Sequence, residues 1–354
     1  MGFFSKFICL IIGVSVFSFA AKAQDQPATD SVSIYEKLLE ELLNLKSTDE
    51  ISAELESKIN ASTGLTGNKG FTARNPPNIL SYITKEEIQN SGARDLIDVL
   101  RLVPGFDFGV DVQGVVGIGV RGNWAHEGKL LLLIDGQEMN EVFYATNQFG
   151  NHYSIDQIEK IEIIRGSAIY GGFAEYGVIN IITQKGETIN GVKLTANNGK
   201  MQDAFGRQNA NLMLGKKFGN TDVAVKGFYE LGNRSDATYY DIYDGNYNMT
   251  KNAPLNSSNL NIGISNKNLS ITAIADQYNT KSQNAYGSVL TKPYDVYFLS
   301  YYFEAKYNLK LNEKFTLTPK YNFKRQLPWN FVAGENEVDS LDMGDVYTYN
   351  KQII

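Results

Sequence analysis

Apolar and polar residues alternate with a period of two through much of the second half of the sequence. In residues 303–309 an apolar or aromatic side chain takes every odd position, with Glu304, Lys306 and Asn308 between them. Residues 315–323 repeat the pattern, and residues 260–273 hold two more runs around a polar turn. Because successive side chains of a strand point to opposite faces, each run predicts a strand with one apolar and one polar face. About seven such runs predict an antiparallel sheet in residues 188–354.

Two architectures produce this alternation, and the period alone does not separate them. A water-soluble antiparallel sandwich buries the apolar face of each strand. A transmembrane barrel turns the apolar face to lipid and the polar face to its lumen. The 354 residues and 43% hydrophobic content allow either, together with a second domain. The choice therefore depends on the rest of the sequence.

The N-terminus is typical of an exported protein. Lys6 precedes an apolar run at 7–20, and Ala21-Lys22-Ala23 fits the small-residue rule for cleavage. That run is shorter than a bilayer span, which argues against the alternative of an uncleaved anchor. We predict a signal peptide at residues 1–23. Since the one cysteine, Cys9, lies inside it, the mature chain would depend on burial and hydrogen bonds rather than disulfides.

Length and charge exclude two further classes of protein. No later segment has the apolar length of a membrane helix, so any membrane crossing in this sequence must use strands. The net charge of −6 provides no basic surface for nucleic acid. We therefore expect no nucleic-acid partner.

The first half of the chain divides into an extension and a compact domain. Residues 24–75 are polar at both ends around one leucine-rich amphipathic stretch. Residues 76–187 change to short strands and helices, which predicts an α+β domain. After a strand at 79–83, Thr84 and Glu87 have the spacing of a capping box, and a second helix is expected at 95–103. Further strands are expected at 115–120, 130–134, 161–165 and 178–183.

Two segments match the residues of a binding motif but lack its context. Residues 117–122 fit G-x-G-x-x-G, with Asp135 at the distance of a ribose-binding acid, yet no helix opens at the glycines to hold a pyrophosphate. The oxygens of Asp241, Asp244 and Asn246 are fewer than a calcium site requires. We expect no catalytic residues, no cofactor and no resident metal.

A series of motifs between residues 83 and 183 resembles the plug domain of TonB-dependent outer-membrane receptors. In order they are ITKEEI (83–88), SGA (91–93), DVLRLVPG (98–105), VRG (120–122), LLIDG (132–136), IEKIEIIRG (158–166), and YG leading to GVINIIT (170–183). Their order and spacing are similar to those of the family over most of the domain. This resemblance is more specific than any single motif.

The resemblance implies a globular α+β plug at 76–187, followed at 188–354 by the first part of an antiparallel transmembrane β-barrel. Barrels of this family have about 22 strands, whereas eight strands leave room for side chains only. The chain is therefore expected to be truncated, with an open, curved sheet whose last edge is unpaired. Residues 24–75 would be a periplasmic extension. The protein would reside in the outer membrane of a Gram-negative bacterium, in contact with outer-membrane lipid.

The implied function is uptake of a scarce, bulky nutrient energised by TonB and its inner-membrane complex. An iron chelate, either a siderophore or haem, is the expected cargo. Carbohydrate and cobalamin are the alternatives within the family. In other classes, the alternatives are a passive porin or adhesin barrel and a secreted sugar-binding β protein.

The resemblance also assigns contact residues. TonB is expected to add as a strand to Asp30-Ser31-Val32-Ser33-Ile34, an acidic, hydroxyl and β-branched pattern. The stretch at 45–48 is a second candidate.

For contacts between plug and barrel, the family pattern indicates Arg121 and Arg165, together with Glu159 and Glu162. The alternative is that these are ordinary solvated charges, since ion pairs matter mainly where they are desolvated.

Ligand contacts are expected at two places that the family turns outward. Trp124 with His126, and His152 with Tyr153, fall in plug segments near the apex. Imidazole is a common transition-metal ligand, although exposed histidines without that role are more frequent. Tyr240 and Tyr243 lie in a long polar segment whose aromatic and amide groups suit a polar ligand. A solvated loop is the alternative there.

Overall fold

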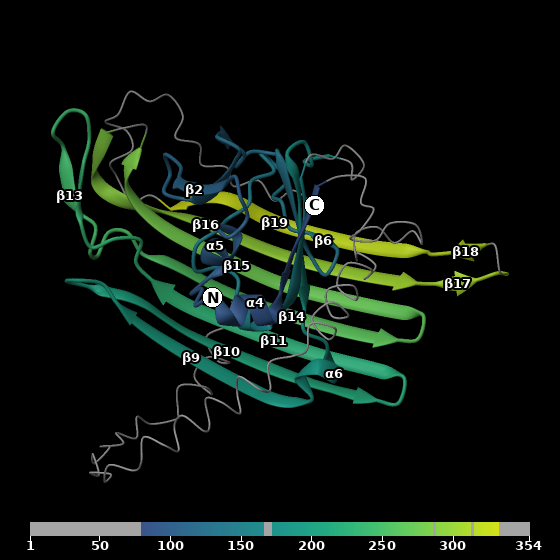
Figure 1. Cartoon of the computed structure of the whole chain (residues 1–354). Coiled ribbons are helices and arrows are strands. Elements are labelled where there is room, and N and C mark those ends of the chain that lie inside the picture. The colour runs from purple at the N-terminus through teal and green to yellow at the C-terminus, as the bar shows by residue number, and fades with distance from the viewer. Residues whose placement is uncertain (1–78, 166–171, 286–287, 313–314, 333–354) are drawn as a thin grey trace, which may run out of the picture. The chain divides into compact units, whose positions relative to one another are not determined.

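The computed structural model describes residues 79–165, 172–285, 288–312 and 315–332, all of which belong to one compact unit (Figure 1). Within these ranges no helix is long and apolar enough to cross a membrane. The signal peptide and both TonB-contact candidates lie outside the described residues.

The first part of this unit is an α+β domain, here called the plug, built on a five-stranded sheet. The strand order is β1-β7-β8-β5-β6, and β5 and β8 are its parallel pair. These strands are β1 (Ile79–Thr84), β5 (Leu130–Ile134), β6 (Gln137–Glu138), β7 (Ile158–Arg165) and β8 (Gly177–Thr183). A smaller sheet contains β2 (Phe106–Val110), β3 (Val116–Val120) and β4 (Asn123–Trp124). Isoleucine and leucine side chains from both sheets share one buried core.

Short helices close the plug. Helix α4 (Lys85–Asn90) has the predicted capping box, because the Thr84 side chain accepts from the Glu87 amide and Glu87 reaches back to the Thr84 amide. Helix α5 (Leu96–Leu100) is shorter than the predicted 95–103. Its continuation to Val103 has i→i+3 hydrogen bonds, a tightening that precedes Pro104. A 3₁₀ turn, η1 (Ile155–Gln157), precedes β7.

The second part is one antiparallel sheet, here called the wall, with the strand order β19-β16-β15-β14-β11-β10-β9. Its strands are β9 (Gly191–Lys200), β10 (Phe205–Phe218), β11 (Thr221–Gly232), β14 (Leu255–Asn266), β15 (Leu269–Ala285), β16 (Ser288–Tyr307) and β19 (Lys320–Val332). Two small hairpins, β12 (Thr238–Tyr240) with β13 (Asn246–Asn248) and β17 (Leu309–Lys310) with β18 (Thr316–Leu317), lie at opposite ends of the sheet (Figure 1). Strands of 10 to 20 residues are long enough for the roughly 9 to 11 residues that a crossing of the hydrocarbon core requires.

The polarity of the wall is the reverse of a soluble sheet. Charged and amide side chains are buried on the face toward the plug, while large apolar side chains are exposed on the other face. The buried set includes Asn211, Lys226, Asn261, Glu304 and Gln326, and the exposed set includes Val192, Leu194, Phe218, Tyr321 and Phe323. A sandwich would bury the second set. The arrangement therefore selects the membrane-barrel architecture from the two that the alternation allowed.

A short connection joins the plug to the wall at very close range. Helix α6 (Gly186–Ile189) leads into β9, and the amides of Gly186 and Glu187 donate to the Asp222 carboxylate on β11 at 2.8 and 2.6 Å. A Cβ on Gly186 would lie 2.1 Å from the carbonyl oxygen of Val223. Glycine is required here because the backbone of the connection contacts the backbone of the wall.

Candidate functional site

Five aromatic and imidazole rings form a continuous cluster, here called the aromatic apex. Trp124, His126, Phe143 and Tyr144 come from the plug, and Trp329 comes from β19. Ring centroids are 5.5 Å apart for Trp124 and His126, 6.3 Å for His126 and Trp329, 6.2 Å for Trp329 and Tyr144, and 6.4 Å for Tyr144 and Phe143. Trp124 and Tyr144 are 47% and 58% exposed, whereas His126 and Trp329 are 2% and 8% exposed. Exposed rings at the ends are thus supported by buried rings in the middle.

One buried carboxylate shapes the turn that presents Phe143 and Tyr144. Glu141 accepts hydrogen bonds from the amides of Phe143 and Tyr144, both at 2.6 Å. The amide and hydroxyl of Thr146 donate to the same carboxylate, each at 3.2 Å. These donors hold the turn in one conformation, so its two exposed rings keep a defined position.

Trp329 reaches the apex through a bulge in β19. Tyr297 pairs with Asn330 and Leu299 pairs with Leu327, so two residues of β19 lie opposite one residue of β16. Trp329, which follows a proline, has a φ of 52°, an uncommon conformation for a bulky residue. Bulges redirect side chains. Here the indole points to the plug and donates to Glu141 Oε1 at 3.3 Å.

Both histidines that we expected near the ligand are buried. Close approach of Gly117 leaves no room around His126, since a Cβ there would lie 2.5 Å from its Nδ1. The His126 Nε2 is 3.4 Å from a carboxylate oxygen of Asp111, and neither ring nitrogen has a hydrogen bond. His126 therefore supports the exposed rings from beneath.

His152 lies between plug and wall. It is 1% exposed, its Nδ1 is 2.7 Å from the Gln148 carbonyl oxygen, and its Nε2 is 3.0 Å from a carboxylate oxygen of Asp276 on β15. Its ring stacks on Tyr153 at 4.0 Å. Burial raises the pKa of the Tyr153 hydroxyl well above its ordinary value. His152 and Asp276 thus form a contact between plug and wall.

Tyr240 and Tyr243 are exposed in the β12–β13 hairpin. Asp241 organises the turn by accepting from the amides of Tyr243 and Gly245, and from that of Val289 at the start of β16. The hydrogen bond from the Val289 amide, followed by those from Tyr243 and Gly245, lowers the pKa of Asp241. No cluster of three metal-ligating side chains is found within the described ranges.

The four residues predicted to contact the barrel have other surroundings. Arg121 is exposed, and the Arg165 guanidinium donates to the carbonyl of Pro104 and the hydroxyl of Ser81, both in the plug. Among the described residues, the structure places no wall carboxylate beside either arginine. Glu159 Oε2 is buried without a hydrogen bond. The arginine–carboxylate pairing therefore stays a prediction.

Glu162 belongs to a buried group within the plug sheet. It accepts from the Tyr82 hydroxyl at 2.8 Å and from Asn180 at 3.2 Å, and Lys160 lies 3.0 Å away. Burial raises the pKa of the Tyr82 hydroxyl. These contacts join β1, β7 and β8.

One described ion pair between plug and wall was not predicted. On one side, Arg207 of β10 lies 3.6 Å from Asp95 of the plug and donates to the Arg94 carbonyl at 2.8 Å. The arginine is thus on the wall and the carboxylate on the plug. Sequence pattern gave no signal for this pair, because Arg207 matches no motif.

A second contact centres on Asp135, at the end of β5. Its carboxylate accepts from the Thr183 amide at 2.8 Å, the Thr183 hydroxyl at 2.6 Å and Asn261 of β14 at 3.2 Å. Lys226 of β11 lies 3.7 Å from it and also donates to the Thr183 hydroxyl. Asp135, which has the spacing of a ribose-binding acid in the sequence, therefore connects the plug to the wall through hydrogen bonds and an ion pair.

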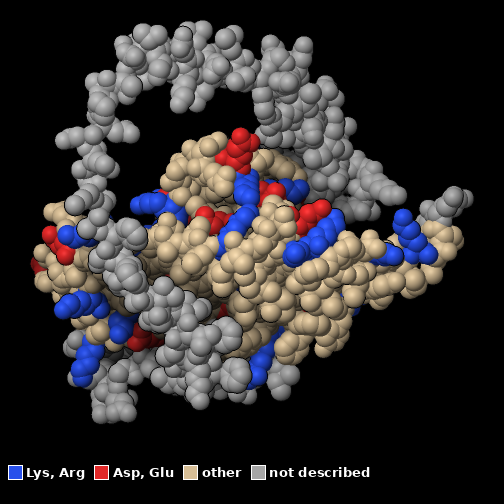
Figure 2. Space-filling model, turned by 90° about the horizontal axis from the view of Figure 1, so that it is seen from below, with Lys and Arg blue, Asp and Glu red and all other residues tan. Residues whose placement is uncertain are grey.

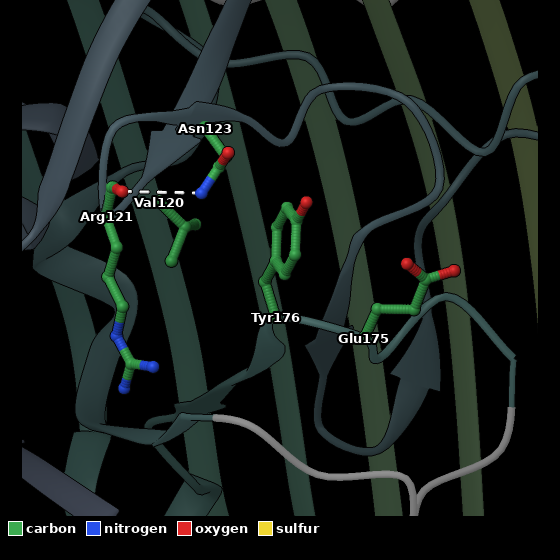
Figure 3. A pocket seen from close by; sticks show the side chains of 5 residues that line it. All are labelled: Val120, Arg121, Asn123, Glu175 and Tyr176. Carbon is green, nitrogen blue, oxygen red and sulfur yellow. Dashed lines mark hydrogen bonds between the residues drawn. The ribbon is translucent and has the colours of Figure 1, made fainter.

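A small pocket also opens on the plug surface, in front of wall strands that pass behind it (Figure 3). Val120, Arg121, Asn123, Glu175 and Tyr176 line a volume of about 150 Å³. Ligand pockets for drug-sized molecules have about 300–1,000 Å³. This pocket is too small for a bulky nutrient. On the face in Figure 2, the described Lys and Arg residues are interspersed with Asp and Glu, and large areas carry neither charge.

Comparison with known proteins identifies the family. Residues 72–178 match the model of the TonB-dependent receptor plug domain. The chain carries the plug domain of TonB-dependent receptors. As a TonB-dependent receptor it is an outer-membrane protein of a Gram-negative bacterium, and both the predicted family and the predicted fold class are confirmed.

Curated relatives of this TonB-dependent receptor are named as transporters. The vitamin B12 transporter BtuB of Vibrio vulnificus (strain CMCP6) is 27% identical over 74% of this chain, and the match covers 39% of the relative's length. BtuB of Photobacterium profundum is 37% identical over 34% of the chain and 20% of its own length. The receptor chain thus spans well under half the length of these relatives.

Solved structures agree on the fold. The receptor matches a double mutant of the ferric enterobactin receptor PfeA from Pseudomonas aeruginosa with a TM-score of 0.50 and 18% identity, over 75% of this chain and 42% of that one. It matches the unliganded ferric citrate transporter FecA with a TM-score of 0.50 and 12% identity, over 70% and 40%. At these identities the likeness concerns the fold alone.

Proposed function

We propose that this receptor imports a scarce, bulky nutrient across the outer membrane with energy supplied through TonB and its inner-membrane complex. The observation that carries the proposal is the plug packed on the polar face of the wall. Hydrogen bonds and ion pairs between them, such as those of Asp135 and His152, can be replaced by water when the plug moves. A passive porin or an adhesin has no need of such a domain. The proposed domains are 1–23, 24–75, 76–187 and 188–354.

Cargo would bind above the aromatic apex and the β12–β13 hairpin, without any covalent chemistry by this chain. Exposed Trp124, Tyr144, Tyr240 and Tyr243 offer flat apolar faces with polar edges, which suit a large ligand of mixed polarity. We propose an iron chelate as this cargo. Burial of both histidines favours a siderophore over histidine-ligated haem.

Cobalamin is the second candidate, because two curated relatives are vitamin B12 transporters. Growth separates the two cargoes. A strain lacking the receptor should lose growth on limiting ferric siderophore and keep growth on limiting cyanocobalamin. The reverse pattern would replace iron by cobalamin, and loss of neither would count against both.

TonB would bind the extension at Asp30–Ile34 by strand addition, in which main-chain hydrogen bonds supply most of the affinity. Val32→Pro removes one amide and restricts the backbone, so uptake should be abolished while ligand binding at the cell surface is kept. Ser47→Pro, in the second candidate segment, is the matched control and should leave uptake intact. Normal uptake by the Val32→Pro receptor would reject the first segment.

A further inference from the structure

Strand β19 contacts one plug segment residue by residue. Asn322 donates to Gln137 Oε1 at 2.8 Å, and Lys324, two residues on, donates to Glu138 Oε1 at 3.5 Å. Lys324 also donates to the Asn140 carbonyl. Alternate residues of the strand thus follow consecutive positions of the plug. Beyond them the bulge places the Trp329 indole on the next plug residue, Glu141.

The last of these contacts differs from the others in its surroundings. Glu141 is 2% exposed, and its carboxylate already holds the turn that presents Phe143 and Tyr144. The Trp329 indole adds a donor from the wall to that same carboxylate, and its ring packs edge-on against Phe298 at 4.8 Å. The uncommon backbone conformation of Trp329 is unfavourable by itself, and backbone strain of this kind is concentrated at functional sites.

We propose that Glu141 and Trp329 are positioning residues for the cargo site. Neither reaches the exposed surface, yet together they set where Phe143 and Tyr144 stand relative to the wall. This inference rests on the proposed function, since it concerns the same apex. It predicts that the apex loosens when the carboxylate is changed, even though no exposed ring is removed.

Glu141→Gln is the sharpest perturbation. The carboxylate oxygens accept from the amides of Phe143 and Tyr144 at 2.6 Å, and an amide side chain must turn a nitrogen toward one of these donors. Two donors then face each other in a buried place, which costs more than losing the hydrogen bond alone. The turn should open and release the indole of Trp329.

Tryptophan fluorescence reports this directly, because both tryptophans of the chain belong to the apex. In a Trp124→Phe background of the full-chain receptor, acrylamide should quench Trp329 weakly. Adding Glu141→Gln should raise the quenching constant toward that of Trp124, measured in the Trp329→Phe protein. Asn322→Ser, which removes the hydrogen bond to Gln137 at the far end of β19, is the control and should leave Trp329 protected.

The quenching result decides the proposal without any cargo. A Glu141→Gln protein with unchanged quenching would overturn it, and so would an equal rise in the Asn322→Ser control, which would indicate general loosening of the plug. For cargo we expect Glu141→Gln to weaken binding of ferric enterobactin or cyanocobalamin, whichever the parent binds, about tenfold. If the parent binds neither probe, the cargo assignment fails while the quenching result still stands.

Discussion

Replacing Asp135 by asparagine should weaken the contact between plug and wall and lower the free energy of plug unfolding. The carboxylate receives two hydrogen bonds from Thr183 and one from Asn261, with Lys226 at 3.7 Å. Asparagine keeps the shape and one acceptor oxygen, so the Thr183 amide can still be satisfied. What disappears is the second acceptor oxygen, which receives the Thr183 hydroxyl and Asn261, and the negative charge beside the Lys226 ammonium, whose side chain is 3% exposed.

The magnitude follows from that buried ammonium. Removing one partner of a buried ion pair costs about 3–5 kcal/mol, because the other charge stays buried without compensation. The 3.7 Å separation and the 24% exposure of the Asp135 side chain place this pair at the lower end. We expect a loss of about 3 kcal/mol in the free energy of plug unfolding, which is more than a hundredfold in the equilibrium constant.

Urea unfolding of the purified receptor, followed by tryptophan fluorescence of the apex, measures this loss. With a slope of about 1–3 kcal/mol per molar, the midpoint should fall by about 1 M or more. Lys226→Met in the same chain as Asp135→Asn removes the stranded charge and should recover most of the loss. A shift of Asp135→Asn within experimental error, or a double variant as unstable as the single one, would refute the reasoning.

Three further perturbations follow from the plug and its connection. Gly186→Ala places a Cβ within 2.1 Å of a wall carbonyl oxygen and should prevent assembly of a protease-resistant plug, whereas Gly227→Ala, with open space around it, should not. Thr84→Ala removes the capping box of α4 and should lower the unfolding free energy by about 1 kcal/mol in urea titrations. Hydrogen bonding to Arg94 lowers the pKa of Asp98 below 3.8. The pair therefore stabilises the fold above pH 3.8, and this stabilisation is lost as the pH falls through the lowered pKa. Asp98→Asn should abolish that part of the acid dependence of unfolding.

Much of the fold is encoded locally and could be predicted. Period-two alternation marked the wall strands because each strand separates lipid from lumen. The capping box at Thr84 and Glu87 was visible because a helix start depends on side chains three residues apart. The end of α5 was placed too late, since the apolar face continues to Val103 while the hydrogen bonding changes before Pro104.

The site was less predictable because its contacts are far apart in the sequence. Trp124 could be proposed as a surface aromatic, but nothing local pairs Glu141 with Trp329, and the bulge that joins them depends on how β19 pairs with β16. The two histidines were expected at the surface, yet neighbouring rings bury them. Residue type alone does not reveal which neighbours cover a side chain.

Dependence of uptake on TonB tests the central claim most directly. Cells that express the receptor should accumulate radiolabelled cargo from nanomolar solution when TonB is present. Without TonB they should bind it at the surface and accumulate none. Energy is required because the plug packs against the polar face of the wall and must move before cargo can pass. Equal accumulation with and without TonB would contradict the account and indicate a passive barrel.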